Sequence, residues 1–384
     1  MLSVRSSLGL ELVVCALLHA MGSVASADEA GETAHADFGK AFATAINERD
    51  RGALGELFDV REFASIVADD LFDDEDAKRG YLRGMLSHGR TKFISRLFHG
   101  WLSQELTAKY LRTMEGNRPL VRLDFDGGGH EYMLLSLRRK SNKYVAVDLF
   151  PMTTGRNLSE SIGIATQIML NPTESLLARL FGNSYKLNPE IVSKLTRVGD
   201  LQRGGDFKSA YDLLLSLPEP VRDNRVMVDF AIKLASLIGD TEYQVELTRL
   251  EKLYGDEESA GFMLIDYYFT IGEYDKAIRT VDRLEAFLGE DAALSNLRAN
   301  FALTSQDYER ALQFASRATE LEQDFEDAYW TLVTVANDRR QYDKVVETLQ
   351  QIEALFGYDF VADDFNDDFY SEFYQSDAMK AWLQ

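Results

Sequence analysis

A group of positions in the second half of the chain recurs at a nearly constant interval. The group combines a turn glycine, an aromatic residue and a small or apolar residue, and its members are Gly205, Gly239, Gly272, Tyr274, Tyr308, Tyr342, Ala277, Ala311 and Val345. Successive tyrosines stand 34 residues apart, and the glycines are separated by steps of 34 and 33. Repetition at this interval is typical of stacked supersecondary units rather than of one globular core.

The unit that spans residues 258–291 resembles a tetratricopeptide repeat. The resemblance is carried by apolar or small positions on two helices and by the turn between them: Leu264, Tyr268, Gly272, Tyr274, Ala277, Val281 and Leu284. In this family such residues let two antiparallel helices approach closely. The two following units match in the same way, and two preceding units match more loosely. The resemblance implies five helical hairpins over residues 191–359, forming an all-α solenoid that binds a protein or a peptide.

The same resemblance places one residue set on the inner wall of the solenoid, which the first helix of each hairpin lines. These residues lie five and nine places into each unit: Asp229, Lys233, Phe262, Asp266, Asn296, Asn300, Trp330 and Thr334. Amide and aromatic groups in such a groove suit an extended peptide or a partner helix. Two alternatives remain open at this point: the positions are ordinary exposed sites, or the chain itself fills the groove.

Residues 37–158 are expected to form a separate α+β domain. Three helical stretches are predicted first, starting at Asp37 and spanning 52–71 and 77–104, and four short strands follow at 110–115, 120–125, 132–138 and 144–149. Short turns join the strands, so we expect a four-stranded antiparallel sheet with helices on one face. The order of elements is similar to that of cystatin-like and NTF2-like folds. The predicted fold class is therefore an α+β domain followed by an all-α solenoid of helical hairpins.

Two further segments complete the expected organisation. Residues 159–190 carry helix-capping signals and no long flexible stretch, so they are predicted to be a helical bridge between the domains. Residues 360–384 are dense in aromatic and acidic side chains, and they are predicted to form a capping helix that covers the end of the solenoid. A tail that binds a partner through the same residues is the alternative.

The first 27 residues read as a secretory signal peptide. A basic start, an apolar stretch and the small residues Ala25, Ser26 and Ala27 follow one another in the order that signal peptidase requires. Cleavage after Ala27 would leave residues 28–36 as a flexible start and would remove Cys15, the single cysteine. The leader predicts export to the periplasm, and a mature chain without disulfides.

The charge of the chain restricts its partners. The 63 Asp and Glu residues outnumber the 41 Lys and Arg residues, and the formal net charge is −22. Nucleic acid is not expected as a partner, because its binding requires cations that neutralise phosphates. A protein or peptide, especially a basic one, matches this charge better. No cofactor is implied by any motif.

An enzymatic reading rests on one acidic hairpin. Asp124, Asp126, His130 and Glu131 lie within eight residues and would suit a hydrolase or a metal site if they converged in a cleft. Polar side chains at a glycine-rich hairpin tip are the simpler interpretation, and no established catalytic motif is present. The sequence therefore predicts a non-catalytic adaptor or scaffold. The alternative is a ligand-binding or hydrolytic first domain that the repeats dock to a complex.

Overall fold

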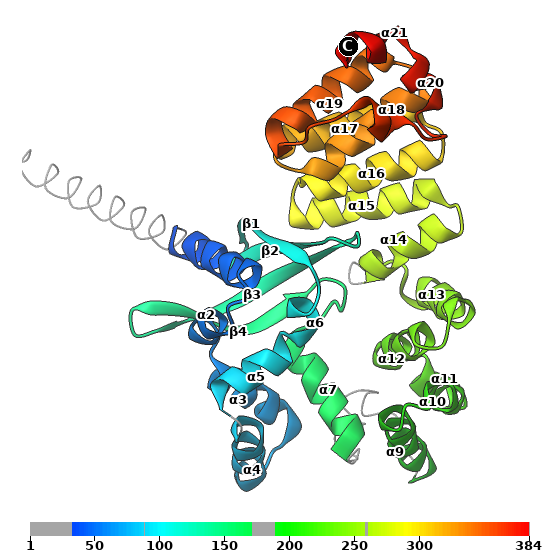
Figure 1. Ribbon diagram of the computed structural model, residues 1–384. Coiled ribbons are helices and arrows are strands. Elements are labelled where there is room, and N and C mark those ends of the chain that lie inside the picture. The colour runs from blue at the N-terminus through cyan, green and yellow to red at the C-terminus, as the bar shows by residue number, and fades with distance from the viewer. Residues whose placement is uncertain (1–32, 88, 171–188, 258–259, 384) are drawn as a thin grey trace, which may run out of the picture. The chain divides into compact units, whose positions relative to one another are not determined.

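The computed structural model describes residues 33–87, 89–170, 189–257 and 260–383 (Figure 1). The predicted signal peptide over residues 1–27 lies outside the described residues, as do residues 28–32 of the expected flexible start and residues 171–188 of the bridge. Two compact units divide the chain, unit 1 over residues 1–200 and unit 2 over residues 201–384. None of the helices in the described ranges is long and apolar enough to cross a membrane.

Unit 1 begins with a series of helices that is more segmented than the sequence predicts. A helix over residues 33–47 is followed by α2 (Arg51–Leu57), α3 (Val60–Leu71), α4 (Glu75–Leu86), α5 (Arg90–Leu97) and α6 (His99–Leu102). The stretch predicted as one helix over 52–71 breaks at Asp59. Its N–H donates to the Ala146 carbonyl at 2.8 Å, and its carboxylate accepts from the N–H of Glu62 and so caps α3. The stretch predicted over 77–104 breaks at Gly89, which has a φ of 80°.

The sheet of unit 1 consists of four antiparallel strands in the order β1-β2-β3-β4. The strands are β1 (Leu106–Met114), β2 (Arg118–Phe125), β3 (His130–Lys140) and β4 (Lys143–Pro151), so each is longer than predicted. Asn117 and Ser141 take left-handed backbone conformations in two of the connecting turns. The predicted α+β domain with a four-stranded antiparallel sheet is confirmed.

Both faces of the central strands are buried. One face carries Val121, Leu123, Met133 and Leu135, which join the helical side chains of the main core. The members of that core from the helices are mostly aromatic or aliphatic: Phe38, Phe42, Ile46, Leu54, Phe58, Phe63, Val67, Ile94 and Phe98. The opposite face carries Leu120, Arg122, Tyr132 and Leu134, and none of these side chains is more than 2% exposed. A sheet that is covered on both faces accounts for the continuous buried runs in β2 and β3.

Helix α7 (Leu158–Leu170), which begins the segment predicted as a helical bridge, packs onto unit 1. Leu158 and Ile162 lie against the main core, and the carboxylate of Asp148 on β4 accepts the N–H of Ser159 at 3.1 Å and its hydroxyl. Burial raises the pKa of Asp148, and the hydrogen bonds from Ser159 oppose that shift. The strand thus provides the N-terminal cap of the following helix.

Glu131 on β3 is a buried carboxyl group that ties β3 to the end of β4. One of its oxygens accepts the backbone N–H of Thr153 at 3.2 Å, and the other accepts the Thr153 hydroxyl. Burial raises the pKa of Glu131 to about 7, although the hydrogen bonds from Thr153 favour the ionised form. The carboxyl group therefore changes its charge near neutral pH inside the protein.

Helix pairs follow one another along the rest of the chain. They are α9 (Pro189–Arg203) with α10 (Phe207–Leu215), α12 (Arg225–Ser236) with α13 (Asp240–Tyr254), α14 (Gly261–Thr270) with α15 (Tyr274–Leu288), α16 (Ala292–Thr304) with α17 (Tyr308–Leu321), and α18 (Glu326–Asp338) with α19 (Tyr342–Phe356). A short helix, α11 (Glu219–Arg222), precedes α12. Unit 2 begins inside α9, and consecutive helices from α12 onward pack against one another.

The turns inside these pairs share one backbone geometry. The second residue after the first helix has a left-handed conformation in four pairs, at Gly205, Gly272, Gln306 and Arg340. The N–H of the next residue donates to the carbonyl five positions back, as from Glu273 to Tyr268 at 2.8 Å, which is a Schellman-type helix end. Gly239 is different, because its φ of 163° is extended.

The repeated positions of the second helices serve the packing between helices. Ala277, Ala311 and Val345 are fully buried, so the two helices of each pair approach closely at these sites. Tyr274, Tyr308 and Tyr342 are half-buried at the first residue of their helices. The Tyr274 ring meets the Phe269 ring edge-on at 5.9 Å between centroids, while Tyr342 packs against Phe373.

The C-terminal segment covers the last pair as a set of short pieces. It consists of a 3-10 turn (Ala362–Phe365), α20 (Ser371–Gln375) and α21 (Asp377–Trp382), rather than the single capping helix expected within residues 360–384. The helix is interrupted at Ser376, which is extended and caps α21 by accepting the N–H of Met379. Phe365, Phe373 and Met379 are buried in one core with Val345, Leu349 and Ile352 of α19.

Candidate functional site

The residues predicted to line the groove of the solenoid separate into two groups. Those nine places into each unit, Lys233, Asp266, Asn300 and Thr334, are exposed or half-buried. Those five places in are more enclosed: Phe262 and Asn296 are buried, Trp330 is half-buried, and half-buried Asp229 forms an ion pair with Arg225 at 2.8 Å. The first group therefore provides the accessible polar groups on the surface formed by the first helices, which we call the first-helix face. These groups are an ammonium, a carboxylate, an amide and a hydroxyl.

The chain itself contacts the last of the predicted groove positions. The Trp330 ring meets the rings of Tyr358 and Phe360 edge-on, at centroid distances of 5.8 and 5.9 Å. Both the Trp330 indole N–H and the Tyr358 hydroxyl donate to Glu326, at 2.9 and 2.6 Å. The segment after α19 thus packs around Trp330. This agrees with the alternative in which the chain itself fills the groove, at this end of the solenoid.

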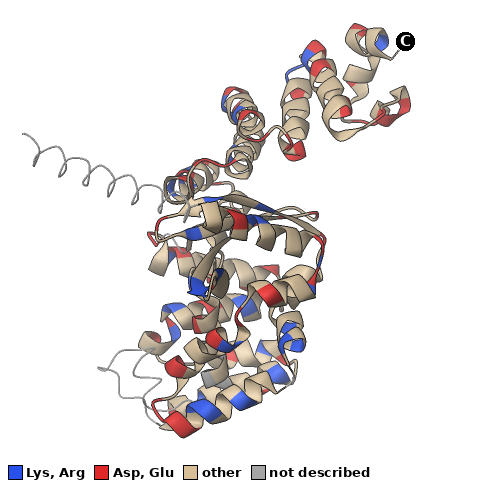
Figure 2. Cartoon of the chain, turned by 90° about the vertical axis from the view of Figure 1, so that its left-hand side faces the viewer, with Lys and Arg blue, Asp and Glu red and all other residues tan. Residues whose placement is uncertain are grey.

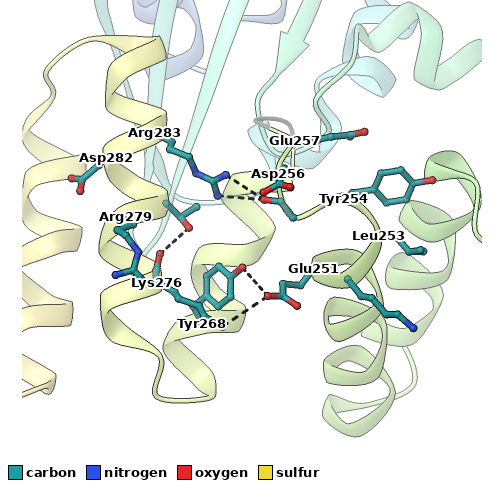
Figure 3. A pocket seen from close by; sticks show the side chains of 13 residues that line it. Glu251, Leu253, Tyr254, Asp256, Glu257, Tyr268, Lys276, Arg279, Asp282 and Arg283 are labelled. Atoms are coloured by element: carbon teal, nitrogen blue, oxygen red, sulfur yellow. Dashed lines mark hydrogen bonds and ion pairs between the residues drawn. The ribbon is translucent and has the colours of Figure 1, made fainter.

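A pocket of about 580 Å³ lies between the second helices α13 and α15 (Figure 3). Lys276, Arg279 and Arg283 follow one another on a single face of α15, because residues three, four and seven places apart align on a helix. Arg283 extends toward the segment after α13 and donates to the Gly255 carbonyl at 3.3 and 3.4 Å. The α13 side contributes Glu251 and Lys252.

The lining of the α13–α15 pocket contains four cations and four carboxylates. Two of the carboxylates form ion pairs with arginines outside the lining, Glu257 with Arg225 at 2.6 Å and Asp282 with Arg298 at 2.8 Å. Each of these arginines also binds a second carboxylate, Asp229 and Glu285 respectively. Glu251 accepts a hydrogen bond from Tyr268 at 3.3 Å, and its distance to the Lys276 ammonium is 4.0 Å. Burial raises the pKa of the Tyr268 hydroxyl, and the charge of Glu251 adds to the shift, so this hydroxyl stays a donor.

Two cations of the α13–α15 pocket have no close partner. Within the described chain, neither Arg279 nor Lys252 forms a hydrogen bond or an ion pair, and both side chains are exposed. The lining as a whole is balanced in charge, with four cations and four carboxylates. Arg279 and Lys252 are thus the cations of the lining that are left for a ligand.

The acidic hairpin of unit 1 brings together only some of the four residues that the sequence suggested for an enzymatic site. The His130 Nδ1 lies 2.7 Å from a carboxylate oxygen of Asp124, and Arg122 binds the same carboxylate through two nitrogens at 2.8 and 2.9 Å. Burial would raise the pKa of Asp124, but the hydrogen bonds from His130 and Arg122 outweigh it and hold the pKa below its usual value. Asp126 is exposed at the hairpin tip, and Glu131 binds Thr153 instead.

This arrangement supplies no complete catalytic constellation among the residues that the structure describes. Asp124 orients His130, as a carboxylate orients a catalytic imidazole, yet the same carboxylate is held by Arg122 as a buried ion pair. The part of the chain that can be searched contains no group of three His, Cys, Asp or Glu side chains placed to hold a metal ion. A ligand-binding or hydrolytic role for unit 1 stays a prediction.

The periodic helix pairs, their shared turns and the buried alanines at the same step decide the architecture of the C-terminal half. It is a tetratricopeptide-type solenoid. The prediction of this fold from the repeated positions is confirmed.

Similarity to solved structures extends over about half of the chain. The sequence matches no protein-family profile, and no curated protein matches it. Solved structures that match include MamA from Desulfovibrio magneticus RS-1, at 13% identity and a TM-score of 0.36, covering 45% of this chain and 98% of that one. PilW, described as a widely conserved type IV pilus biogenesis factor, matches at 11% identity and a TM-score of 0.33, covering 51% and 99%. YrrB, described as a TPR protein with an unusual peptide-binding site, matches at 15% identity and a TM-score of 0.30, covering 46% and 96%. These matches carry no information on partners.

Charge is distributed very unequally between the units. Residues 201–384 contain 17 Lys and Arg against 37 Asp and Glu, a formal net charge of −20, and therefore hold all but −2 of the chain's total of −22. The segment after α19 is the extreme, with seven Asp or Glu residues and one lysine, Lys380 (Figure 2). The acidity that the sequence shows as a whole is a property of the tetratricopeptide-type solenoid.

Exposed apolar side chains follow the same division. All the large hydrophobic residues that are strongly exposed within the described ranges belong to unit 2: Leu237, Val245, Leu253, Phe269, Ile271, Phe287, Leu355, Tyr358, Val361, Phe369 and Tyr374. Leu237 and Ile271 occupy the same place at the ends of α12 and α14, one repeat apart. Surfaces of this kind are common where proteins bind partners.

Sequence reasoning did not identify the α13–α15 pocket or the Arg122–Asp124 ion pair. A signal for the pocket exists, since three cations at positions 276, 279 and 283 share one helix face inside a strongly acidic segment. For Arg122, alternation on β2 places it on the same face as Asp124, but its complete burial has no signature in a single sequence.

Proposed function

We propose that this protein is a non-catalytic interaction scaffold whose tetratricopeptide-type solenoid binds a basic protein or peptide. The observation that carries the proposal is the concentration of charge and exposed apolar residues in one unit. Unit 2 has a net charge of −20 and also contains the strongly exposed large hydrophobic residues found in the described chain. Acidic charge steers a basic partner toward the surface, and exposed apolar groups provide contact area after the encounter.

The first-helix face is the proposed binding surface. Lys233, Asp266, Asn300 and Thr334 lie at successive repeat positions and remain accessible to varying degrees. A partner segment that runs along successive helices would meet one polar group per hairpin, and these groups can bond to its backbone. Asp266 has no hydrogen bond or ion pair from its side chain to another described residue, so its charge is available to a basic partner.

A matched pair of charge reversals tests the binding surface. Tagged full-length chain, its Asp266→Lys variant and its Glu347→Lys variant are used to capture proteins from an envelope extract. Glu347 is an exposed carboxylate on the second helix α19, so its reversal makes the same change of net charge away from the first-helix face. We expect captured basic proteins to be lost with Asp266→Lys and retained with Glu347→Lys. Equal capture by all three chains would contradict the proposed surface.

Export is the second element of the proposed function. It is supported by the order of basic start, apolar stretch and Ala25, Ser26 and Ala27 at the N-terminus. The mass of the chain recovered from a periplasmic fraction should correspond to residues 28–384. Recovery of the chain with its first 27 residues in the cytoplasm alone would contradict export.

A further inference from the structure

We infer that the α13–α15 pocket is a binding site for carboxylate groups, either of an acidic peptide or of a small free polycarboxylate. This inference does not rest on the proposed function, because it concerns second helices and a ligand of the opposite charge. The pocket volume of about 580 Å³ falls in the range of small-ligand sites.

The pocket lining is balanced in charge, whereas its surroundings are acidic. It contains four cations and four carboxylates, and two of these carboxylates, Glu257 and Asp282, form ion pairs with arginines outside the lining. The rest of unit 2 is so acidic that its net charge is −20. Four cations gathered in one lining inside an acidic unit are not explained by solubility, because solubility would be served equally well by more acids.

The donors of the pocket are placed for a carboxylate ligand. Arg279 is a planar guanidinium without a hydrogen bond or ion pair in the described chain, and it can bind a carboxylate through two parallel hydrogen bonds. Lys276 lies next to it on α15 with its ammonium over the Tyr268 ring at 5.4 Å. Lys252 belongs to the lining on the α13 side and is also without a close partner. Cations of two helices thus contribute to one lining.

The structural alternative is that these cations only hold the two hairpins together. Arg283 has such a role, since it donates to the Gly255 carbonyl that follows α13. Arg279 and Lys252 do not, because each is exposed and neither bonds to the neighbouring hairpin. The two kinds of cation can therefore be separated by substitution.

A charge reversal with a repeat-matched control tests the carboxylate site. Arg279→Glu removes the unpartnered guanidinium from the pocket. Lys344→Glu makes the same net change at the position of α19 that corresponds to Lys276, two repeats further on and outside the pocket lining. The probes are hexaglutamate with blocked termini, hexaglutamine as its neutral match, and citrate, measured by calorimetry at low salt with the full chain. Circular dichroism confirms that each variant is folded.

We expect hexaglutamate to bind the wild type and the Lys344→Glu variant, and Arg279→Glu to weaken it by about tenfold or more, as the loss of a charged hydrogen-bond donor implies. Hexaglutamine should not bind. Binding of citrate alone, with the same dependence on Arg279, would support the site with a free polycarboxylate as its ligand. The net charge of unit 2 repels both probes, so unspecific attraction cannot produce these results. No binding of either anionic probe, or equal weakening by both substitutions, would overturn the inference.

Discussion

Replacing Phe373 with Ala is expected to lower the free energy of unfolding of unit 2 by about 3–5 kcal/mol, the usual cost of truncating a fully buried phenylalanine. Phe373 is 0% exposed and lies in the core shared by α19 and the C-terminal pieces. Its ring contacts the rings of Tyr342, Phe365 and Tyr370. Truncation leaves a cavity at the place where the last hairpin is covered, and the surrounding rings collapse into it only in part.

Phe369 provides the matched control for this prediction. It is the same residue type four places earlier in the same segment, but it is 45% exposed. We expect Phe369→Ala to change the unfolding free energy by less than about 1 kcal/mol. Urea denaturation of the full chain gives the two values. Hydrogen exchange should show the loss for Phe373→Ala first in α18 and α19, because repeats are stabilised by their neighbours. Equal costs for the two variants would show that the C-terminal segment does not act as a cap.

Glu131→Gln is expected to make unit 1 more stable than the wild type at pH 8 by roughly 3 kcal/mol, with little difference near pH 4.5. The folded protein raises the pKa of Glu131 from 4.5 to about 7, so folding favours the protonated carboxyl group. The protonated carboxyl group of Glu131 stabilises the folded state fully below the unfolded-state pKa of 4.5. This contribution is lost as the pH rises through about 7, the pKa in the folded state. The amide of Gln is neutral at every pH and retains a hydrogen-bond acceptor for the Thr153 N–H.

The control for Glu131→Gln is Glu160→Gln, which removes a carboxylate from the exposed surface of α7. Hydrogen exchange of the β3 amides in the full chain reports the local stability between pH 5 and 8. The difference between the two variants isolates the buried carboxyl group from the effect of net charge. Identical pH profiles for the two variants would contradict the assigned role of Glu131.

Local sequence signals predicted the architecture well, because helix pairs and short hairpins depend on residues close in the chain. The step of 34 between tyrosines located the hairpins, and alternation with turn residues located the four strands. Helix breaks were missed where distant parts of the chain cause them. Asp59 interrupts a helical stretch because its N–H bonds to Ala146, which lies 87 residues away in the sequence.

The burial of individual side chains and the ion pairs of the candidate sites could not be predicted in the same way. The period places Phe262 and Asn300 on first helices, but it does not distinguish the buried side chain from the exposed one. The electrostatics of the α13–α15 pocket depend also on Arg225 and Arg298, which pair with Glu257 and Asp282 from other helices. Such pairs arise from packing between repeats, and a single sequence contains no direct record of them.

The turns of the solenoid show what is duplicated from one hairpin to the next. Gly205, Gly272, Gln306 and Arg340 occupy the same left-handed backbone state, with φ between 56° and 79°. Glycine adopts this state freely, whereas glutamine and arginine adopt it at a cost of order 1 kcal/mol. The feature that recurs in these four turns is thus a left-handed backbone conformation rather than a residue type. Hairpins of this kind accommodate different turn residues as long as that conformation is kept.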